Sequence, residues 1–593
     1  MVIAILDFGA QYTKVIDRRI RELKIESDIV ASDTHVEKLR EYDALILSGG
    51  PSSVYEKDAP QFDKKLFQLN IPVLGICYGM QLMNHALGGK VQSMTTKEYG
   101  ETVINIRKSR LFDGLNGEQQ VLMSHGDSVV QLAPGFRVIA MSDDLVAGIE
   151  HAEKKLYGVQ FHPEVDLTTH GKKILANFVY TICNLKPTFT LSKRMNESIA
   201  EIRACVGDRK VLVLVSGGVD SAVTAALLRK ALKQEQIYAI HVDHGFMRKN
   251  ESNSVCAALE RIGLNVRRVD AQREFILALA GVVEPEKKRK IIGDMFIKIV
   301  DREIRKLKLP KDTFLAQGTL RPDLIESASS LVSGTANKIK THHNDSELVR
   351  QRRKKGFVIE PNKDMHKDEV REVGRLLGLP KEITERQPFP GPGLAVRIIC
   401  ADLVAENTVD VEKKVKTIAA RHGFQSAVLP IRSVGVQGDH RSYGYVAAIS
   451  GVGKWSALRA AAQEIPRVVH EVNRVVYLFD QQLSGVSVKK TTLTDEVIKL
   501  LREADAIVQR KLQALNISQV PVILIPVAFS HGTHSVVLRP FMTNDFMTGR
   551  PAAFGEIPVM CLKEIVCGVS KLSGISAVFY DLTSKPPATT EWE

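Results

Sequence analysis

Short runs of hydrophobic residues alternate with amphipathic stretches along the first part of the chain. The apolar runs are VIAIL, DALILSGG and IPVLGIC, with helical patterns from Gln11 to about Leu23 and near Gln61 to Leu69 between them. This rhythm predicts a parallel sheet with helices on both faces. In such sheets ligands bind at the carboxyl ends of the strands, so we expect a functional site directly after these runs.

Further along, the pattern divides the chain into more domains. After Lys186-Pro187, an amphipathic helix from Met195 to Cys205 precedes the strands VLVLV and YAIHVDHG. The unit SAVLPIRSVGVQGDHRSYGYVAAISG, with a following helix and strand, is echoed by VPVILIPVAFSHGTHSVVLRPFMTN with its own helix and strand. We therefore predict an α/β protein with domains at 1–190 and 195–400 and two α+β modules at 405–485 and 495–593.

Composition supports a multidomain globular protein. The chain has 593 residues, too many for one hydrophobic core, and no apolar run approaches the roughly 18 residues of a membrane span. MVIAILDFG lacks a basic signal-peptide region, so we expect a cytosolic protein that contacts no membrane. The seven cysteines contain no CxxC pair and should be reduced.

The net charge of +13 allows either a nucleic-acid surface or attraction for phosphorylated small molecules. It is concentrated in basic clusters such as 287–290 and 350–355. A single basic cluster is most often a solvated helix face, and we do not expect nucleic acid as a partner.

The strongest candidate for chemistry is Cys77. The strand PVL runs into Gly75-Ile76-Cys77-Tyr78-Gly79, a nucleophile elbow with cysteine in place of serine. The glycines permit a tight turn, and the helix that begins there favours a thiolate.

A cysteine nucleophile needs a base and a group that orients the base. Phe161-His162-Pro163-Glu164 follows the strand-like KLYGVQF and supplies both, with His162 as base and Glu164 as its partner. Backbone amides of Tyr78 and of the Ser48–Pro51 loop, which includes Gly50, are candidates to hold an oxyanion.

A second strand, turn and helix start carries Ser216-Gly217-Gly218-Val219-Asp220-Ser221, with Ala222 next. This is not the GxxxxGK[ST] loop, but free amides and the helix dipole at such a turn still bind an anion. The two glycines allow close backbone approach, the serines add hydroxyl donors, and Asp220 is a candidate ligand for Mg²⁺.

GICYGMQ, LSGGP, MSHGD and QFHPE occur in order, and with them the first domain resembles a class I glutamine amidotransferase of flavodoxin-like fold. The resemblance implies that Cys77 attacks the side-chain amide of glutamine, forms a thioester and releases ammonia. It also implies that Gln81, Ser124 and His125 line the glutamine pocket.

SGGVDS matches the pyrophosphate loop of the ATP pyrophosphatases, a doubly wound fold whose members adenylate a substrate with ATP. By this resemblance Asp243 and Gly245, after the next strand, lie near adenosine. Lys340 in IKTHHN is a candidate cation on the phosphate side.

PFPGPGL, KRKIIGD, QGTLRPDLIES and the SKPPATTEW tail extend the resemblance over the whole chain, which is similar to the GMP synthetase family. This implies glutamine, ATP and xanthosine monophosphate (XMP) as substrates. The positions in XMP-binding motifs are Arg289, Asp439, Gln519, Lys585 and Glu591. The doubled module resembles the eukaryotic form, and it leaves open whether the protein is a monomer or a homodimer.

Three alternatives stay open on the residues alone. One is another amidotransferase-fed adenylating ligase, and a second is an RNA-thiolating pyrophosphatase, which commonly carries a cysteine pair that this chain lacks. The third is a binding or regulatory protein that keeps the fold without the chemistry.

Overall fold

The structure is a computed structural model of the chain. It describes residues 2–10, 12–56, 59–321, 352–402, 408–437, 440–479, 483–529, 531–543, 549–585 and 587–593. These residues form two compact units. Of the described residues, the first unit contains those up to Glu197, Leu320, Arg321 and Lys363–Glu369, and the second contains Ser198–Thr319, 352–362 and Val370–Glu593.

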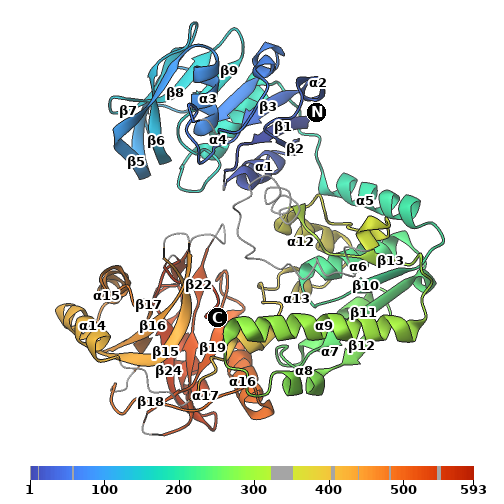
Figure 1. Ribbon diagram of the computed structural model, residues 1–593, viewed down its shortest axis with the longest axis vertical. Coiled ribbons are helices and arrows are strands. Elements are labelled where there is room, and N and C mark those ends of the chain that lie inside the picture. Colours follow the sequence, from blue (N-terminus) through green and yellow to red (C-terminus); the bar gives the residue numbers. More distant parts are fainter. Residues whose placement is uncertain are drawn as a thin grey trace. The chain divides into compact units, whose positions relative to one another are not determined.

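The first unit is built on a nine-stranded sheet in the order β2-β1-β3-β4-β9-β8-β7-β5-β6 (Figure 1). Its strands are β1 (Val2–Asp7), β2 (Glu26–Ala31), β3 (Ala44–Leu47), β4 (Val73–Ile76), β5 (Lys90–Ile106), β6 (Glu118–Gln131), β7 (Arg137–Ser142), β8 (Leu145–His151) and β9 (Leu156–Val159). The part β2-β1-β3-β4-β9 is parallel and has the flavodoxin-like order, which confirms the predicted fold class.

The other half of the sheet was not predicted from the sequence, and there β5, β6, β7 and β8 pair antiparallel. Buried and exposed residues alternate along much of β6, the pattern of a strand with one solvated face. The segment expected as a helix near Gln61 is a short 3₁₀ turn, Lys64–Gln68. There the side chain of Asp63 caps the amide of Lys65.

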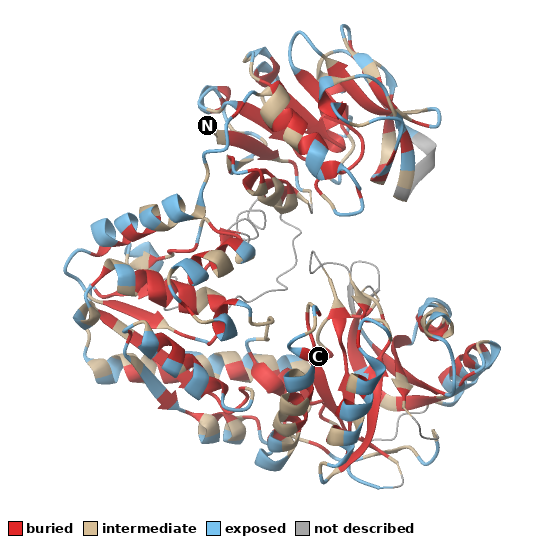
Figure 2. Cartoon of the chain, turned by 180° about the vertical axis from the view of Figure 1, so that it is seen from behind, coloured by how far each residue is buried: buried red, intermediate tan, exposed pale blue. Residues whose placement is uncertain are grey.

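Helices α1 (Thr13–Glu22), α2 (Val36–Leu39), α3 (Tyr78–Ala86) and α4 (Gly171–Ala176) complete this unit. Alternate residues of β1 enter different cores: Ile3 and Ile5 belong to one, and Ala4 and Leu6 to the other. Since successive side chains of a strand point to opposite faces, the sheet is covered on both sides. Figure 2 shows its strands as buried throughout their centre.

A buried cluster of polar side chains holds helix α1 in place through Asp17. Asp17 is fully buried and accepts hydrogen bonds from Ser27 Oγ at 2.7 Å and His366 Nε2 at 2.7 Å, and its carboxylate lies 2.8 Å from Arg321 Nε. Burial raises the pKa of Asp17, but His366 and Arg321 lower it more, so the net shift is downward. A charged aspartate is thus retained in the interior because its partners replace water.

Helix α5 (Leu191–Val206) crosses the boundary between the units, and the second unit continues with a parallel sheet of order β12-β11-β10-β13-β14. The strands are β10 (Val211–Leu214), β11 (Ile237–Asp243), β12 (Val266–Asp270), β13 (Phe314–Ala316) and β14 (Val358–Ile359). Its helices are α6 (Val219–Ala231), α7 (Glu251–Arg261), α8 (Gln272–Ala278), α9 (Pro285–Leu307) and α13 (Lys381–Thr384), together with α12 (Lys367–Leu376) from Val370 onward. The order 3-2-1-4-5 is that of a doubly wound fold, as expected.

The two C-terminal repeats share one six-stranded sheet, β15-β16-β17-β24-β21-β19. The first repeat gives β15 (Gln425–Gln437), β16 (His440–Ser450), α15 (Trp455–Val468) and β17 (Val472–Leu478), and the second gives β19 (Val522–Ile525), β21 (His534–Leu538), α17 (Val559–Ser570) and β24 (Ile575–Asp581). In each repeat, the first and second strands pair antiparallel, and the second and third strands pair parallel. The repeats meet where β17 and β24 pair antiparallel.

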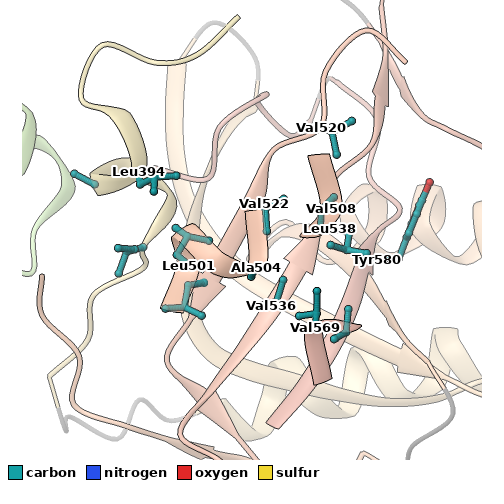
Figure 3. Close-up of a cluster of buried hydrophobic side chains, with 14 of the residues drawn as sticks. Leu394, Leu501, Ala504, Val508, Val520, Val522, Val536, Leu538, Val569 and Tyr580 are labelled. Atoms are coloured by element: carbon teal, nitrogen blue, oxygen red, sulfur yellow. The ribbon is translucent and has the colours of Figure 1, made fainter. Parts of the chain in front are cut away.

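Helices α14 (Val409–Arg421) and α16 (Asp495–Leu512) precede the two repeats. Figure 3 shows Leu501, Ala504 and Val508 of α16 among side chains of the sheet and of α17. This core is continuous with that of the five-stranded sheet. The boundaries predicted at 400, 405, 485 and 495 stay predictions.

Among the described residues, no helix is both long enough and apolar enough to cross a membrane.

Candidate active sites

Cys77 lies at the turn between β4 and α3. Its φ of 52° and ψ of −109° place a non-glycine residue in a strained backbone conformation, as expected for a nucleophile elbow. The two glycines of the motif permit close packing. A Cβ at Gly75 would lie 2.6 Å from the backbone of Gly79, and one at Gly79 would lie 2.4 Å from Leu47 O.

The predicted catalytic residues come together at this turn. His162 Nδ1 lies 2.8 Å from Glu164 Oε1, and both side chains are buried. Burial lowers the pKa of His162, but Glu164 and a hydrogen bond with Cys77 raise it more, to about 10. The arrangement therefore favours an imidazolium beside the sulfur.

The loop predicted to hold an oxyanion lies beside these residues. A Cβ at Gly49 would be 3.4 Å from the His162 ring and 3.8 Å from Cys77 Cβ. Ser48 Oγ accepts a hydrogen bond from the amide of Phe8 at 3.0 Å and donates one to Gly49 O at 2.9 Å, which fixes the loop. A Cβ at Gly50 would lie 2.8 Å from Phe8 O, so close packing requires glycine there.

Residues expected to line a glutamine pocket also lie here. Ser124 O is 3.8 Å from Cys77 Sγ, while the side chains of Gln81 and His125 both bond to Asp127 O, at 2.8 and 2.9 Å. Tyr78 packs its ring on Phe8, and burial raises its pKa to about 12. The backbone amide of Tyr78, at the start of α3, stays a candidate oxyanion donor.

The sequence interpretation missed two neighbours of the catalytic residues. The ring of Tyr12 lies edge-on to His162 with centroids 5.1 Å apart, and Gln160 Nε2 lies 3.6 Å from Cys77 Sγ. Gln160 follows β9 and precedes His162 by two positions. Both residues lie beyond the end of β9, so the sequence signal for this contact was only the closeness of Gln160 to the predicted base.

The glycine-rich loop of the second unit joins β10 to α6. Gly217 has φ +89°, Gly218 is the residue before α6, and Val219, Asp220, Ser221 and Ala222 form its first turn. The hydroxyls of Ser216 and Ser221 lie 3.2 Å apart, and Ser221 donates to Gly218 O at 3.1 Å. The turn is thus formed by its own backbone and hydroxyls.

Two residues that the sequence interpretation did not select support this loop from outside. Asn362 donates to the backbone oxygen of Asp220 at 2.9 Å and to Thr224 Oγ1 at 3.0 Å. Arg386 donates to Gly217 O at 2.5 Å and pairs with Glu251. Neither contact is readable from local sequence, because both span more than a hundred positions.

Asp243 and Gly245 lie at the carboxyl end of β11, next to β10. Asp243 accepts hydrogen bonds from the Gly245 amide at 3.1 Å and from Arg268 at 2.6 Å. Burial raises the pKa of Asp243, whereas these two donors lower it more strongly, so the pKa falls overall. Lys340 lies outside the described residues.

The XMP-binding candidates gather around the tail. Gln519 and Phe541 exchange two backbone hydrogen bonds, and Gly549 near Phe541 exchanges two with Lys585. Residues 587–593 then run along β15, where Gly435 bridges Ala588 and the Val434 amide donates to Trp592 O. Asp439 lies outside the described residues.

Buried ion pairs hold this tail. Arg397 binds the two carboxylate oxygens of Glu591 at 2.9 and 2.8 Å. Lys288, fully buried on α9, pairs with the side chain of Glu593, and its neighbour Arg289 donates to the backbone oxygen of Glu593. The tail thus brings Arg289, Lys585 and Glu591 to one region of the second unit.

Comparison with known families finds three matches along the chain. Residues 4–182 match the model for "Glutamine amidotransferase class-I", residues 191–295 match "NAD synthase", and residues 511–592 match "GMP synthase C terminal domain". Fold and sites together define a glutamine-dependent, ATP-using carbon–nitrogen ligase.

Curated relatives give the particular family. A glutamine-hydrolysing GMP synthase of Dictyostelium discoideum is 46% identical over the whole chain and 94% of its own length. A probable GMP synthase of Leptospira interrogans (serovar copenhageni) is 40% identical, covering 100% of this chain and 99% of its own. One from Aquifex aeolicus, 43% identical, covers 80% of this chain and 96% of itself. The chain belongs to the glutamine-hydrolysing GMP synthase family, and it makes GMP from XMP with glutamine and ATP as substrates.

Proposed function

We propose that glutamine is hydrolysed at Cys77, with His162 as general base and Glu164 as the group that orients and charges it. The observation that carries this assignment is the elbow itself: Cys77 in a strained turn at the start of α3, with the buried His162–Glu164 pair beside it. His162 takes the thiol proton, the thiolate attacks the amide carbon, and ammonia leaves with that proton. Water then releases glutamate from the thioester.

The negative oxygen formed during this attack needs hydrogen-bond donors. The amides of Tyr78 and Gly50 are assigned this role, since one begins α3 and the other lies in the loop beside His162. Gln81, Ser124 and His125 are assigned to the pocket for the glutamine substrate. Two contacts support this. The side chains of Gln81 and His125 bond to the backbone oxygen of Asp127, and the backbone oxygen of Ser124 lies close to the sulfur of Cys77.

ATP is assigned to the turn at 216–222, where the start of α6 suits a polyphosphate. Asp243 and Gly245 are assigned to the adenosine side and Lys340 to the phosphates. XMP is assigned to Arg289, Asp439, Gln519, Lys585 and Glu591. Cations such as Arg289 and Lys585 suit a phosphate, and the others suit base or ribose edges.

Mg²⁺ fits this site through Asp220. The structure describes no group of three or more acidic, histidine or cysteine side chains that would enclose a metal. Mg²⁺ is commonly held by one or two carboxylates together with substrate phosphates, and one carboxylate in the first turn of α6 meets that need. Bound there, the ion would neutralise charge on the pyrophosphate that leaves.

In the second site the C2 oxygen of XMP attacks the α-phosphorus of ATP and pyrophosphate departs. Ammonia then attacks C2, AMP leaves, and GMP results.

We also infer a cytosolic location. We infer a monomer because the second repeat supplies, in the same chain, the strands that complete the six-stranded sheet. Light scattering near twice 65.7 kDa would contradict the monomer.

The decisive experiment separates the two sites. Cys77→Ala should abolish GMP formation from glutamine and leave formation from ammonium salts intact, with AMP and GMP appearing in equal amounts. Cys183→Ala, at a half-buried cysteine of the same unit, is the matched control and should retain both activities. Loss of both activities in Cys77→Ala, with its fold intact, would overturn the assignment.

A further inference from the structure

Gln160 contacts the sulfur of Cys77, and nothing in the proposed hydrolysis yet uses it. Its side chain follows β9 and is 1% exposed, and Nε2 lies 3.6 Å from Cys77 Sγ. A buried amide beside a reactive sulfur has either its oxygen or its nitrogen toward that sulfur. The two orientations have opposite electrostatic effects on the sulfur.

The hydrogen bonds behind Gln160 decide its orientation. The backbone oxygen of Asp127 can only accept, so Gln81 must present its NH₂ group to it, at 2.8 Å. The same nitrogen of Gln81 then lies 3.1 Å from Gln160, which must offer its oxygen there. The remaining group of Gln160, the Nε2 donor, therefore faces Cys77. The backbone carbonyl of Asp127 thus sets the orientation of the Gln81 amide, which in turn directs an N–H of Gln160 at the sulfur of Cys77.

This donor changes the electrostatic environment of the sulfur. A second neutral group close to Cys77 Sγ is the carbonyl oxygen of Ser124 at 3.8 Å, which disfavours negative charge. The titratable groups on this side are His162 and, behind it, Glu164. One cation and one carbonyl thus act on the thiolate with opposite sign, and an N–H from Gln160 adds to the favourable side.

We propose that Gln160 is a further catalytic residue of glutamine hydrolysis, a hydrogen-bond donor that stabilises the Cys77 thiolate and holds it toward His162. The proposal rests on the assignment of Cys77 as nucleophile. No bond to Gln160 forms or breaks: the thiol proton goes to His162, and Gln160 remains neutral throughout. The chain Asp127–Gln81–Gln160 is its support, so the glutamine pocket and the nucleophile share one hydrogen-bond network.

The test measures how readily Cys77 is alkylated as pH changes. Iodoacetamide reacts with the thiolate, and mass spectrometry of the Cys77 peptide separates it from the other cysteines. Gln160→Met keeps the length of the side chain but removes the donor. It should move the alkylation profile of Cys77 to higher pH by about one unit, the scale of one hydrogen bond to a charged group. Gln160→Glu places a carboxylate there and should move it further.

Activity provides the second readout. In Gln160→Met, kcat for glutamine-dependent synthesis should fall about 10- to 100-fold, the range of one lost donor at an ionised group. GMP formation from ammonium salts should stay unchanged, which also reports that the chain is folded. Gln119→Met is the matched control. Gln119 is buried in the same unit with both amide atoms bonded, to His170 and Asn116, and its replacement should leave the Cys77 profile in place.

The outcomes separate this proposal from the one it rests on. If Cys77→Ala keeps glutamine-dependent activity, the nucleophile itself is misassigned. If Cys77→Ala loses that activity while the alkylation profiles of Gln160→Met and Gln160→Glu coincide with that of the unaltered protein, Cys77 stands and the role of Gln160 is refuted. An equal shift in Gln119→Met would also refute it, because the effect would then be a general loosening of the unit.

Discussion

Two turns of the same kind hold the residues that we assign to the chemistry, and they differ in which residue takes the unusual backbone conformation. In the first unit, between β4 and α3, it is Cys77, with φ 52°. In the second, between β10 and α6, it is Gly217, with φ +89°. The first turn therefore exposes the side chain of Cys77, whereas the second exposes backbone without a side chain at Gly217.

The difference follows from what each turn must contact. Covalent catalysis needs a side chain, so the first turn accepts strain at a cysteine and places the glycines on either side of it. Binding a polyphosphate needs amides at close range, so the second turn uses glycine where a Cβ would obstruct. Substitutions should accordingly act through side-chain chemistry at the first turn and through backbone shape at the second.

The largest effect is expected at the first turn. Glu164→Gln keeps the shape of the side chain but removes the charge that supports protonated His162. Glutamine-dependent kcat should fall by about 10³- to 10⁴-fold, the scale found when the acid of a catalytic triad becomes an amide. Synthesis from ammonium salts should not change. Comparable loss in the control Glu22→Gln, at a salt-bridged glutamate of α1, would remove the special status of Glu164.

The next largest effect is expected from Asp220, whose side chain in the second turn is assigned a role through its charge and not through backbone shape. Asp220→Ala should reduce GMP synthesis by about 10²- to 10³-fold from either nitrogen source, because a charge that acts on the phosphates through Mg²⁺ is lost. Higher Mg²⁺ should partly restore the rate. The exposed Asp208→Ala is its control. If the ammonia-dependent rate were retained in Asp220→Ala, the assignment of Asp220 to the ATP site would be wrong.

Backbone shape at the second turn is tested by two adjacent glycines. A Cβ at Gly217 would lie 3.0 Å from Val255 Cγ2 and 3.1 Å from Arg386 Nη1, at a positive φ. At Gly218, φ is −71° and the nearest atom would be 3.5 Å away. Gly217→Ala should lower the free energy of unfolding by about 1–2 kcal/mol, and Gly218→Ala by much less. Equal losses, measured by chemical denaturation, would show that positive φ is not the constraint.

The smallest effect is a pH dependence of stability at the first turn. The pKa of His162 in the folded chain, about 10, lies above its value of 6.5 in an unfolded chain. Protonated His162 therefore stabilises the fold; this contribution is complete below pH 6.5 and is lost as pH rises through 10. The stability advantage of the unaltered protein over Glu164→Gln should shrink over that range. A constant difference would place the charge elsewhere, and the exposed His85→Gln should show no trend.

Local sequence was enough to place Cys77, His162 and Glu164, because each follows a short apolar strand and such strands end at one edge of a parallel sheet. It also identified the turn at 216–221 for the same reason. It did not reveal the antiparallel half of the first sheet, whose strands alternate polar and apolar residues and so resemble surface segments. Asn362 and Arg386 were missed because their partners are distant in sequence, and only tertiary packing brings them together.

The shared C-terminal sheet also bears on how the chain is made. Its two repeats meet at β17 and β24, where Val476 pairs with Asp581, and Lys288 on α9 reaches Glu593. A ribosome must therefore release nearly all of the second unit before β17 loses its open edge. Until then that strand is a site for mispairing, so the second unit can close only once β24 has been translated, whereas the first unit can largely close earlier.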